Sequence, residues 1–194
     1  CSRVLVHHRV KSKLVSRLVE RAKKLRLGDG LNPKTDVGPV VNAGQLARIH
    51  RYVNIGRREG AKLLCGGRIR SDGELKKGHF YEPTVFDNVK PKMVIAQEEI
   101  FGPVVGIISV KDLDEAVRVN NDTPYGLSSA IFTRDVNKAY RAMRDITTGI
   151  VYVNAGTTGA EVQLPFGGTR GTGNGHREAG QAAIDSFSEW KTIY

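Results

Sequence analysis

The alternation of apolar, β-branched runs with helical patterns constrains the fold of this chain most strongly. Val104–Val110 is an uncharged run typical of a buried strand, and Asp112, with an acid three residues later, marks the start of a helix. The pattern recurs as a strand over 127–132, a helix over 135–146 and a strand over 149–154. Strands joined through helices form right-handed crossovers, so the sequence predicts an α/β fold with a mostly parallel sheet and helices on both faces.

The N-terminal part repeats the same order of elements. Residues 3–7 read as a buried strand, and apolar residues at helical spacing follow from Val10. Asn42, with Gln45 three residues later, is typical of the N-cap of a second helix. Together with the elements above, this predicts one compact domain over 1–194.

In the C-terminal part we expect three further features. The last helix should cover 176–187, and a short strand should cover 190–194. The helix over 135–146 should turn inward a face made of Val136, Ala139, Tyr140 and Met143.

Composition excludes several classes of protein. No apolar run approaches the roughly 20 residues that cross a bilayer, and no secretory leader pattern is present, so we expect neither a membrane partner nor secretion. The two cysteines, Cys1 and Cys65, lack the spacing of metal ligands. We therefore expect free thiols, no metal site and a cytoplasmic location.

The net charge of +10 raises the alternative of nucleic-acid binding, because Lys and Arg neutralise phosphates. The basic residues are dispersed through amphipathic segments, and neither zinc-finger ligands nor an aromatic RNA-binding motif accompanies them. Solvated helix faces explain this distribution better. We expect no nucleic-acid partner.

One octapeptide, Gln97–Val104, combines two acids, an aromatic residue and a Gly-Pro turn directly before the buried strand. It resembles the EEIFGPV signature of the aldehyde dehydrogenase superfamily. Further segments match motifs of that family in the same order: Leu64–Gly67, Tyr81–Thr84, Pro124–Ser128 and Pro165–Gly168. The resemblance covers essentially the whole chain, which is therefore identified as a member of that superfamily with its type of catalytic domain.

The resemblance implies a nicotinamide cofactor, NAD or NADP, and residues that contact it. Glu99 matches the acid that accepts hydrogen bonds from the nicotinamide ribose hydroxyls, a task that suits a carboxylate. Phe101 matches the aromatic residue beside the same ribose. Gln45 and Arg48, one helical turn apart, match positions on the ribose and nicotinamide side, although they could equally form an ordinary polar helix face.

For the substrate, the resemblance implies an aldehyde. Phe166 matches an aromatic residue of the substrate tunnel, and it could also be a core anchor. The small, polar loop 154–161 resembles that of the branch that oxidises aminoadipate semialdehyde, in which backbone amides hold a carboxylate. Gly159 and Ala160 would be the anchors, and a glycine-rich turn without ligand preference is the alternative.

The family reaction requires residues that this chain does not show. A cysteine thiolate attacks the aldehyde, a hydride passes to the nicotinamide, and a glutamate activates the water that hydrolyses the thioester. The family's nucleophile is separated from its Ser-Arg pair by three residues, whereas Cys1 directly precedes Ser2-Arg3 and is out of register.

We therefore expect a catalytic-domain fragment that begins just after the nucleophile and is inactive alone. The nucleotide-binding domain and the C-terminal oligomerisation strand would lie outside it, and the parent would be a homo-oligomer. A noncatalytic binding or assembly module of the same family is the alternative function.

Overall fold

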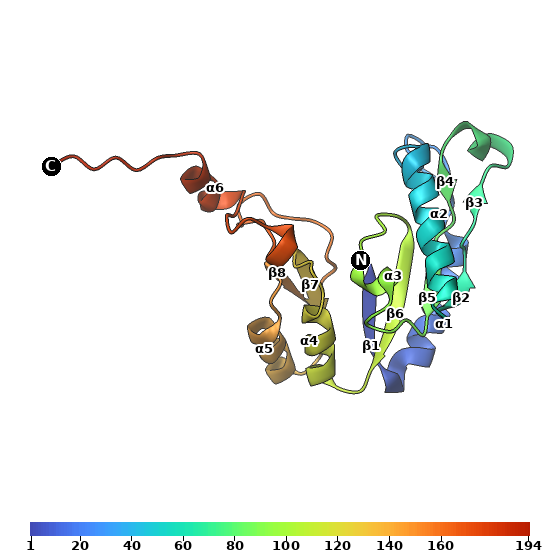
Figure 1. Ribbon diagram of the computed structural model, residues 1–194, viewed down its shortest axis with the longest axis horizontal. Coiled ribbons are helices and arrows are strands. Elements are labelled where there is room, and N and C mark those ends of the chain that lie inside the picture. Colours follow the sequence, from blue (N-terminus) through green and yellow to red (C-terminus); the bar gives the residue numbers. More distant parts are fainter. The chain divides into compact units, whose positions relative to one another are not determined.

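The computed structural model describes residues 1–194 and divides into two compact units, Cys1–Asp112 and Leu113–Tyr194, which are described separately (Figure 1). The first unit contains β1 (Arg3–His7), α1 (His8–Lys24), α2 (Ala43–Arg58), β2 (Lys62–Cys65), β3 (Ile69–Arg70), η1 (Gly73–Lys77), β4 (Phe80–Tyr81), β5 (Thr84–Asp87), α3 (Val94–Gln97) and β6 (Val104–Val110). The second contains α4 (Leu113–Asn121), β7 (Ser128–Ile131), α5 (Val136–Asp145), β8 (Ile150–Val153), η2 (Arg170–Thr172) and α6 (Gly180–Ser186).

The main sheet of the first unit has the strand order β1-β6-β5-β2. Strand β6 pairs in parallel with both β1 and β5, and only β2 runs antiparallel to its neighbour. The apolar run predicted as the clearest core strand is thus the centre of the sheet, and the predicted mixed α/β fold with a mainly parallel sheet is confirmed.

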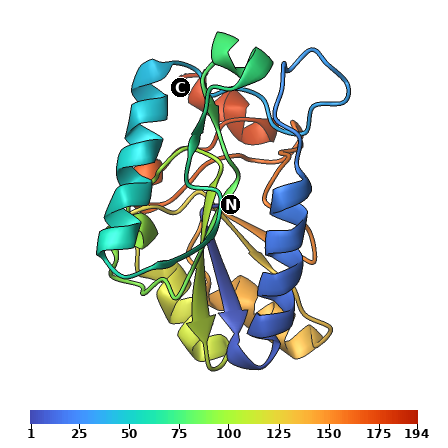
Figure 2. The same cartoon turned by 90° about the vertical axis from the view of Figure 1, so that its right-hand side faces the viewer.

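Helices cover both faces of this sheet (Figure 2). Successive side chains of a strand point to opposite faces, and β5 follows this rule. Val85 packs in a core cluster with Ala22 of α1, whereas the ring of Phe86 lies beside Gly56 of α2. The sheet therefore lies between α1 and α2, as predicted.

Side-chain caps explain where α2 and α5 begin. The Asn42 side chain accepts a hydrogen bond of 2.8 Å from the amide of Gln45, so the predicted cap of α2 is present. Asp135 caps α5 in the same way through the amides of Asn137 and Lys138. None of the helices combines the length and apolarity needed to span a bilayer.

In the second unit, β7 and β8 form a parallel pair connected through α5. The predicted inward face of α5 is wrong for three of its four residues. Ala139 is buried, as is Ala142, but Val136, Tyr140 and Met143 are exposed. Both faces have helical spacing, and the small alanine side chains let the helix approach its neighbours closely, so the alanine face is the one that packs.

The segment after Phe166 lies closely over the start of β7 and β8. The amides of Gly149 and Thr169 both donate to the carbonyl of Gly126. A Cβ on Gly149 would lie 1.9 Å from the carbonyl oxygen of Gly167, and one on Gly126 would lie 2.2 Å from Oγ1 of Thr169. This glycine seam, defined by Gly126, Gly149 and Gly167, leaves no room for side chains.

The C-terminal predictions are partly wrong. The last helix begins at Gly180 rather than near His176, and residues 190–194 form no strand. A strand needs a partner for its backbone hydrogen bonds, and no segment of the chain pairs with these residues. Trp190 is correspondingly 93% exposed.

Candidate functional site

One face of α2 lies along residues 94–102, which comprise α3 and most of the connection from α3 to β6. The residues that contact this segment recur at helical spacing, so they lie on the same side of α2. They are Gln45, Arg48, Ile49, Tyr52 and Gly56 of α2, together with Glu59, which caps the C-terminal end of the helix. We call this set the α2 strip.

Two residues of the α2 strip hold the backbone of the segment. Nε2 of Gln45 donates to the carbonyls of Ile100 (3.0 Å) and Phe101 (2.8 Å). Nη2 of Arg48 donates to the carbonyl of Glu99 at 3.0 Å. Three consecutive carbonyls are thus bound by side chains of one helix.

A side-chain pair continues this arrangement. The hydroxyl of Tyr52 donates to Oε2 of Glu98 at 2.5 Å. The hydrogen bond to the carboxylate, together with burial, raises the pKa of the Tyr52 phenol above its ordinary value. Tyr52 is buried, and the guanidinium of Arg48 lies 5.2 Å from the centre of its ring.

Close packing fixes both ends of the segment. Oε1 of Glu59 accepts a 2.8 Å hydrogen bond from the amide of Val94, the first residue of α3. A Cβ on Gly102 would lie 2.5 Å from Cδ1 of Ile49, and one on Gly56 would lie 2.8 Å from Cδ1 of Ile95. The backbone therefore approaches α2 as closely as glycine permits.

Phe101 has an unusual conformation for a residue with a side chain. Its φ of 55° lies in the left-handed region, and its ring is 74% exposed. The ring borders an open cavity of about 400 Å³ in the first unit, lined by Cys1, Ser2, Glu99, Ile100, Phe101, Gly102 and Val104. An exposed carboxylate and an exposed aromatic ring in one cavity suit a polar, ring-bearing ligand such as a ribose with its base.

The four predicted cofactor residues lie in the first unit and fall into two pairs with different positions. Glu99 and Phe101 line the cavity, whereas Gln45 and Arg48 bind the backbone behind them. The pair Tyr52 and Glu98 was missed at the sequence level. The available signal was the position of Tyr52, seven residues after Gln45 and therefore on the same helix face.

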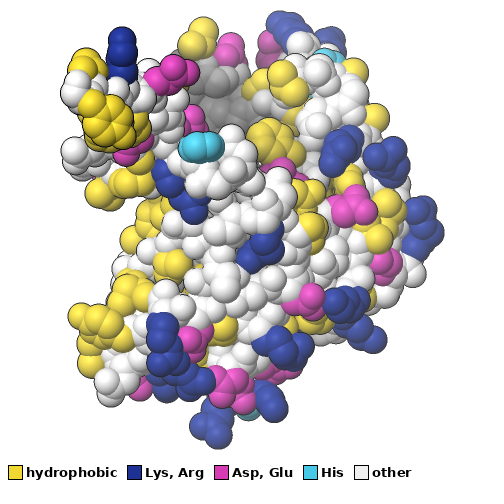
Figure 3. Space-filling view, turned by 60° about the vertical axis from the view of Figure 1, so that its left-hand side comes forward, with side chains coloured by type: hydrophobic (Ala, Val, Ile, Leu, Met, Phe, Trp, Pro, Cys, Tyr) yellow, Lys and Arg dark blue, Asp and Glu magenta, His cyan; other side chains and the backbone are white.

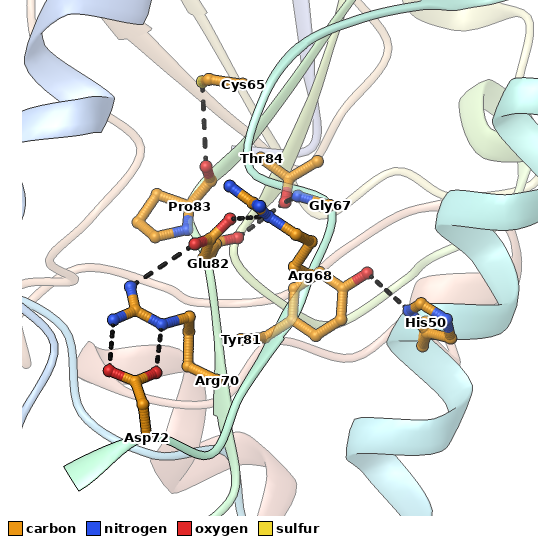
Figure 4. Close-up of polar contacts among 10 residues, drawn as sticks. All are labelled: His50, Cys65, Gly67, Arg68, Arg70, Asp72, Tyr81, Glu82, Pro83 and Thr84. Atoms are coloured by element: carbon orange, nitrogen blue, oxygen red, sulfur yellow. Dashed lines mark hydrogen bonds and ion pairs between the residues drawn. The ribbon is translucent and has the colours of Figure 1, made fainter. Parts of the chain in front are cut away.

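Neither cysteine has the environment of an activated nucleophile. Cys1 lines the cavity and is exposed, and its Sγ makes a weak contact of 3.4 Å with the carbonyl of Arg3. The half-buried thiol of Cys65 contacts the carbonyl of Pro83 (Figure 4), and burial raises its pKa. A raised pKa keeps Cys65 in the unreactive thiol form.

The three predicted substrate residues belong to the second unit. Gly159 has a φ of 91°, and its carbonyl accepts a 2.6 Å hydrogen bond from the hydroxyl of Tyr152. The exposed Ala160 follows it. Phe166 is half-buried and pairs with Glu178 through two backbone hydrogen bonds, so its ring is carried on a short antiparallel bridge.

The positive charge does not gather on the surface that Figure 3 draws. Lys and Arg side chains alternate there with Asp and Glu, and they form no continuous stripe. Several pairs are within ion-pair distance, for example Lys11 with Asp87 at 2.7 Å and Arg26 with Asp36 at 2.9 Å.

Curated relatives match this chain over its whole length. An alpha-ketoglutarate semialdehyde dehydrogenase from Haloferax volcanii is 44% identical over 195 residues, and a betaine aldehyde dehydrogenase from Brucella anthropi is 42% identical over 193 residues. Each match covers 100% of this chain but only 40% and 39%, respectively, of the relative. The chain thus spans about two fifths of the length of these proteins.

Solved structures agree in fold. HpcC from Thermus thermophilus has a TM-score of 0.94 at 42% identity, and the match covers 99% of this chain and 38% of that one. Betaine aldehyde dehydrogenase from Staphylococcus aureus, in complex with NAD⁺, has a TM-score of 0.93 at 36% identity, covering 96% and 37%. The family model described as "Aldehyde dehydrogenase family" matches residues 1–193. This chain belongs to the aldehyde dehydrogenase family.

Proposed function

We propose that the natural full-length protein oxidises an aldehyde to its carboxylic acid with NAD or NADP, and that the cavity beside Glu99 and Phe101 is part of its cofactor site. The observation that carries this proposal is the pairing of an exposed carboxylate with an exposed ring on a backbone bound by α2. The S. aureus relative was crystallised with NAD⁺, which supports a nicotinamide cofactor.

We assign a role to each residue in and behind the cavity. The Glu99 carboxylate accepts hydrogen bonds from the two ribose hydroxyls, because two vicinal O–H donors match its two oxygens. The Phe101 ring packs against the same sugar and excludes water from it. Gln45 and Arg48 contribute from behind, where they bind the supporting backbone. The cofactor, when bound, supplies the hydride acceptor.

We propose a semialdehyde, which carries a carboxylate at its other end, as the substrate. The amides of Gly159 and Ala160 donate to no other group of the chain, and the loop around them is small and exposed. Backbone amides in such a loop bind carboxylates without a charged side chain. Phe166 would contact the aliphatic part of the substrate. The name of the H. volcanii relative agrees with this substrate class.

The remaining parts of the proposal concern the whole protein. The nucleophile and the general base are contributed by residues outside 1–194, since Cys1 is out of register with the family motif. The protein assembles as a homo-oligomer and works in the cytoplasm without nucleic-acid or membrane partners. Free Cys1 and Cys65 are compatible with a reducing compartment.

The test supplies NAD or NADP and measures formation of NADH or NADPH by the natural full-length protein with alpha-ketoglutarate semialdehyde and, separately, with betaine aldehyde, whose charge is opposite. We expect turnover with the semialdehyde, and a Glu99→Gln variant that raises KM for the cofactor about tenfold, which corresponds to about 1.4 kcal/mol. Glu74→Gln, a change at an exposed carboxylate of η1, is the matched control and should leave KM unchanged.

Two outcomes contradict the proposal. Preference for betaine aldehyde would reject the substrate class, because the N–H groups of Gly159 and Ala160 bind an anion and do not stabilise a cation. Absence of aldehyde oxidation with either cofactor would reject the reaction and favour a noncatalytic module of the same family.

A further inference from the structure

Residues 98–103, between α3 and β6, form neither helix nor strand, so their geometry depends on contacts from outside the segment. The left-handed conformation of Phe101 is strained for a residue with a side chain, and such strain persists only where the surroundings enforce it. The carbonyls of Glu99, Ile100 and Phe101 receive their hydrogen bonds from α2 alone. Backbone bonds hold only the two ends of the segment, where Glu98 donates to Val94 and Pro103 accepts from Thr84, so the middle depends on the α2 strip.

Tyr52 is the best-anchored donor of the α2 strip. Its side chain is 4% exposed, and its ring has few rotatable bonds, whereas Arg48 is a long, exposed side chain. The Tyr52 hydroxyl donates to Glu98 and accepts from Nη2 of Arg48 at 3.3 Å. The same Arg48 nitrogen donates to the carbonyl of Glu99, so the phenol orients both polar groups that hold the start of the segment.

We propose that Tyr52 and Glu98 are a positioning pair: their hydrogen bond fixes the backbone that follows Glu98 and thereby places the Glu99 carboxylate and the Phe101 ring for the cofactor. Neither residue lines the cavity, so the pair acts through the segment and not by touching the ligand. The cofactor part of this inference rests on the proposed function. The ordering of the backbone does not.

The chain offers a matched control for Tyr52. Tyr81 of β4 is also almost fully buried, and its hydroxyl lies 3.1 Å from Nδ1 of His50, another residue of α2 (Figure 4). Burial raises the pKa of Tyr81 to about 12, and the pKa of Tyr52 is also raised, so both phenols are neutral at physiological pH. A Tyr81→Phe variant removes a buried phenol bound to the same helix, but it leaves the contacts of residues 98–101 intact.

The experiment compares Tyr52→Phe, Tyr81→Phe and wild type in the natural full-length protein. Hydrogen exchange of the cofactor-free protein reports the order of the segment through the amides of Glu98 and Val104, which flank it and donate to the carbonyls of Val94 and Gly102. Titration with NAD⁺ reports the Kd. For Tyr52→Phe we expect exchange at these two amides about tenfold faster and a Kd about fivefold to tenfold higher, because one charge-assisted hydrogen bond is lost. Tyr81→Phe should lower the melting temperature similarly and change neither quantity at the site.

Variants of Glu98 distinguish loss of the Tyr52–Glu98 hydrogen bond from a general loss of protein stability. Glu98→Gln keeps an acceptor for the Tyr52 hydroxyl and should raise the Kd less than about threefold, whereas Glu98→Ala should reproduce Tyr52→Phe. The double variant Tyr52→Phe/Glu98→Ala should be no worse than either single change, since both remove the same bond.

Four results would overturn the inference in distinguishable ways. Unchanged exchange of the Glu98 and Val104 amides in Tyr52→Phe would reject the positioning pair. Faster exchange with an unchanged Kd would support the effect on backbone order but reject its link to cofactor binding. A wild-type protein that binds no NAD⁺ would also reject that link. Equal effects of Tyr81→Phe on exchange and Kd would show only a general loss of stability.

Discussion

Substitutions that move side-chain volume from Ile49 to Gly102 test how tightly residues 98–103 pack on α2. Ile49 is fully buried, and a methyl group on Gly102 would lie 2.5 Å from its Cδ1 and 2.6 Å from its Cγ1. Gly102→Ala therefore overpacks the contact and should cost about 1–3 kcal/mol in the free energy of unfolding. Ile49→Ala removes three carbons, worth about 2.4 kcal/mol in transfer free energy, and the cavity raises the loss to about 3–4 kcal/mol.

The double variant Ile49→Ala/Gly102→Ala places the new methyl group in the vacated space. It should be about 1–3 kcal/mol more stable than the sum of the single changes predicts. Hydrogen exchange of the β6 amides measures this local free energy of unfolding. Gly30→Ala is the control partner, because a Cβ there meets nothing within 4 Å, and its combination with Ile49→Ala should be additive.

Additivity of Ile49→Ala and Gly102→Ala to within about 0.5 kcal/mol would refute the reasoning, since it would mean that the two side chains do not share one space. A Gly102→Ala variant as stable as wild type would refute it as well.

Three further predictions concern other parts of the chain. Gly149→Ala should destabilise the second unit by more than about 3 kcal/mol, because the backbone oxygen of Gly167 lies 1.9 Å from the new Cβ; thermal melting that matches wild type would contradict this. Asn42→Ala should cost about 1 kcal/mol through loss of the α2 cap, and Asn42→Asp should restore it, as read by hydrogen exchange of the first turn. Hydrogen bonds from Arg26 hold the pKa of Asp36 at about 2, so the carboxylate contributes stability above its unfolded pKa near 4 that is lost as pH falls toward 2. The difference in melting temperature between wild type and Asp36→Asn should therefore be present at pH 7 and shrink below pH 4.

The sequence predicted an element correctly where its residue pattern is compatible with one structure only. The uncharged run Val104–Val110 became the central strand, and Asn42 caps α2 as its spacing indicates. It failed at α5, where two helix faces have the same periodicity and only packing distinguishes the alanine face from the one with Tyr140. It also failed at 190–194, because a strand depends on a partner that a residue pattern cannot reveal.

The candidate site shows the same division. Family motifs identified Glu99 and Phe101, and these residues do line a common cavity. The contribution of Tyr52 was not visible in the sequence, since it depends on α2 lying beside a segment 46 residues away. Contacts between distant segments arise from tertiary packing, which local propensity does not encode.

The glycine seam formed by Gly126, Gly149 and Gly167 has a consequence for how this family can diverge. Because a methyl group at Gly126 or Gly149 would meet atoms of the segment 167–169, a substitution there is harmful unless the opposing segment moves in the same lineage. The three glycines of the seam should therefore be retained together or replaced together during evolution. A descendant that has lost only one of these glycines should also carry an altered path for the segment after Phe166.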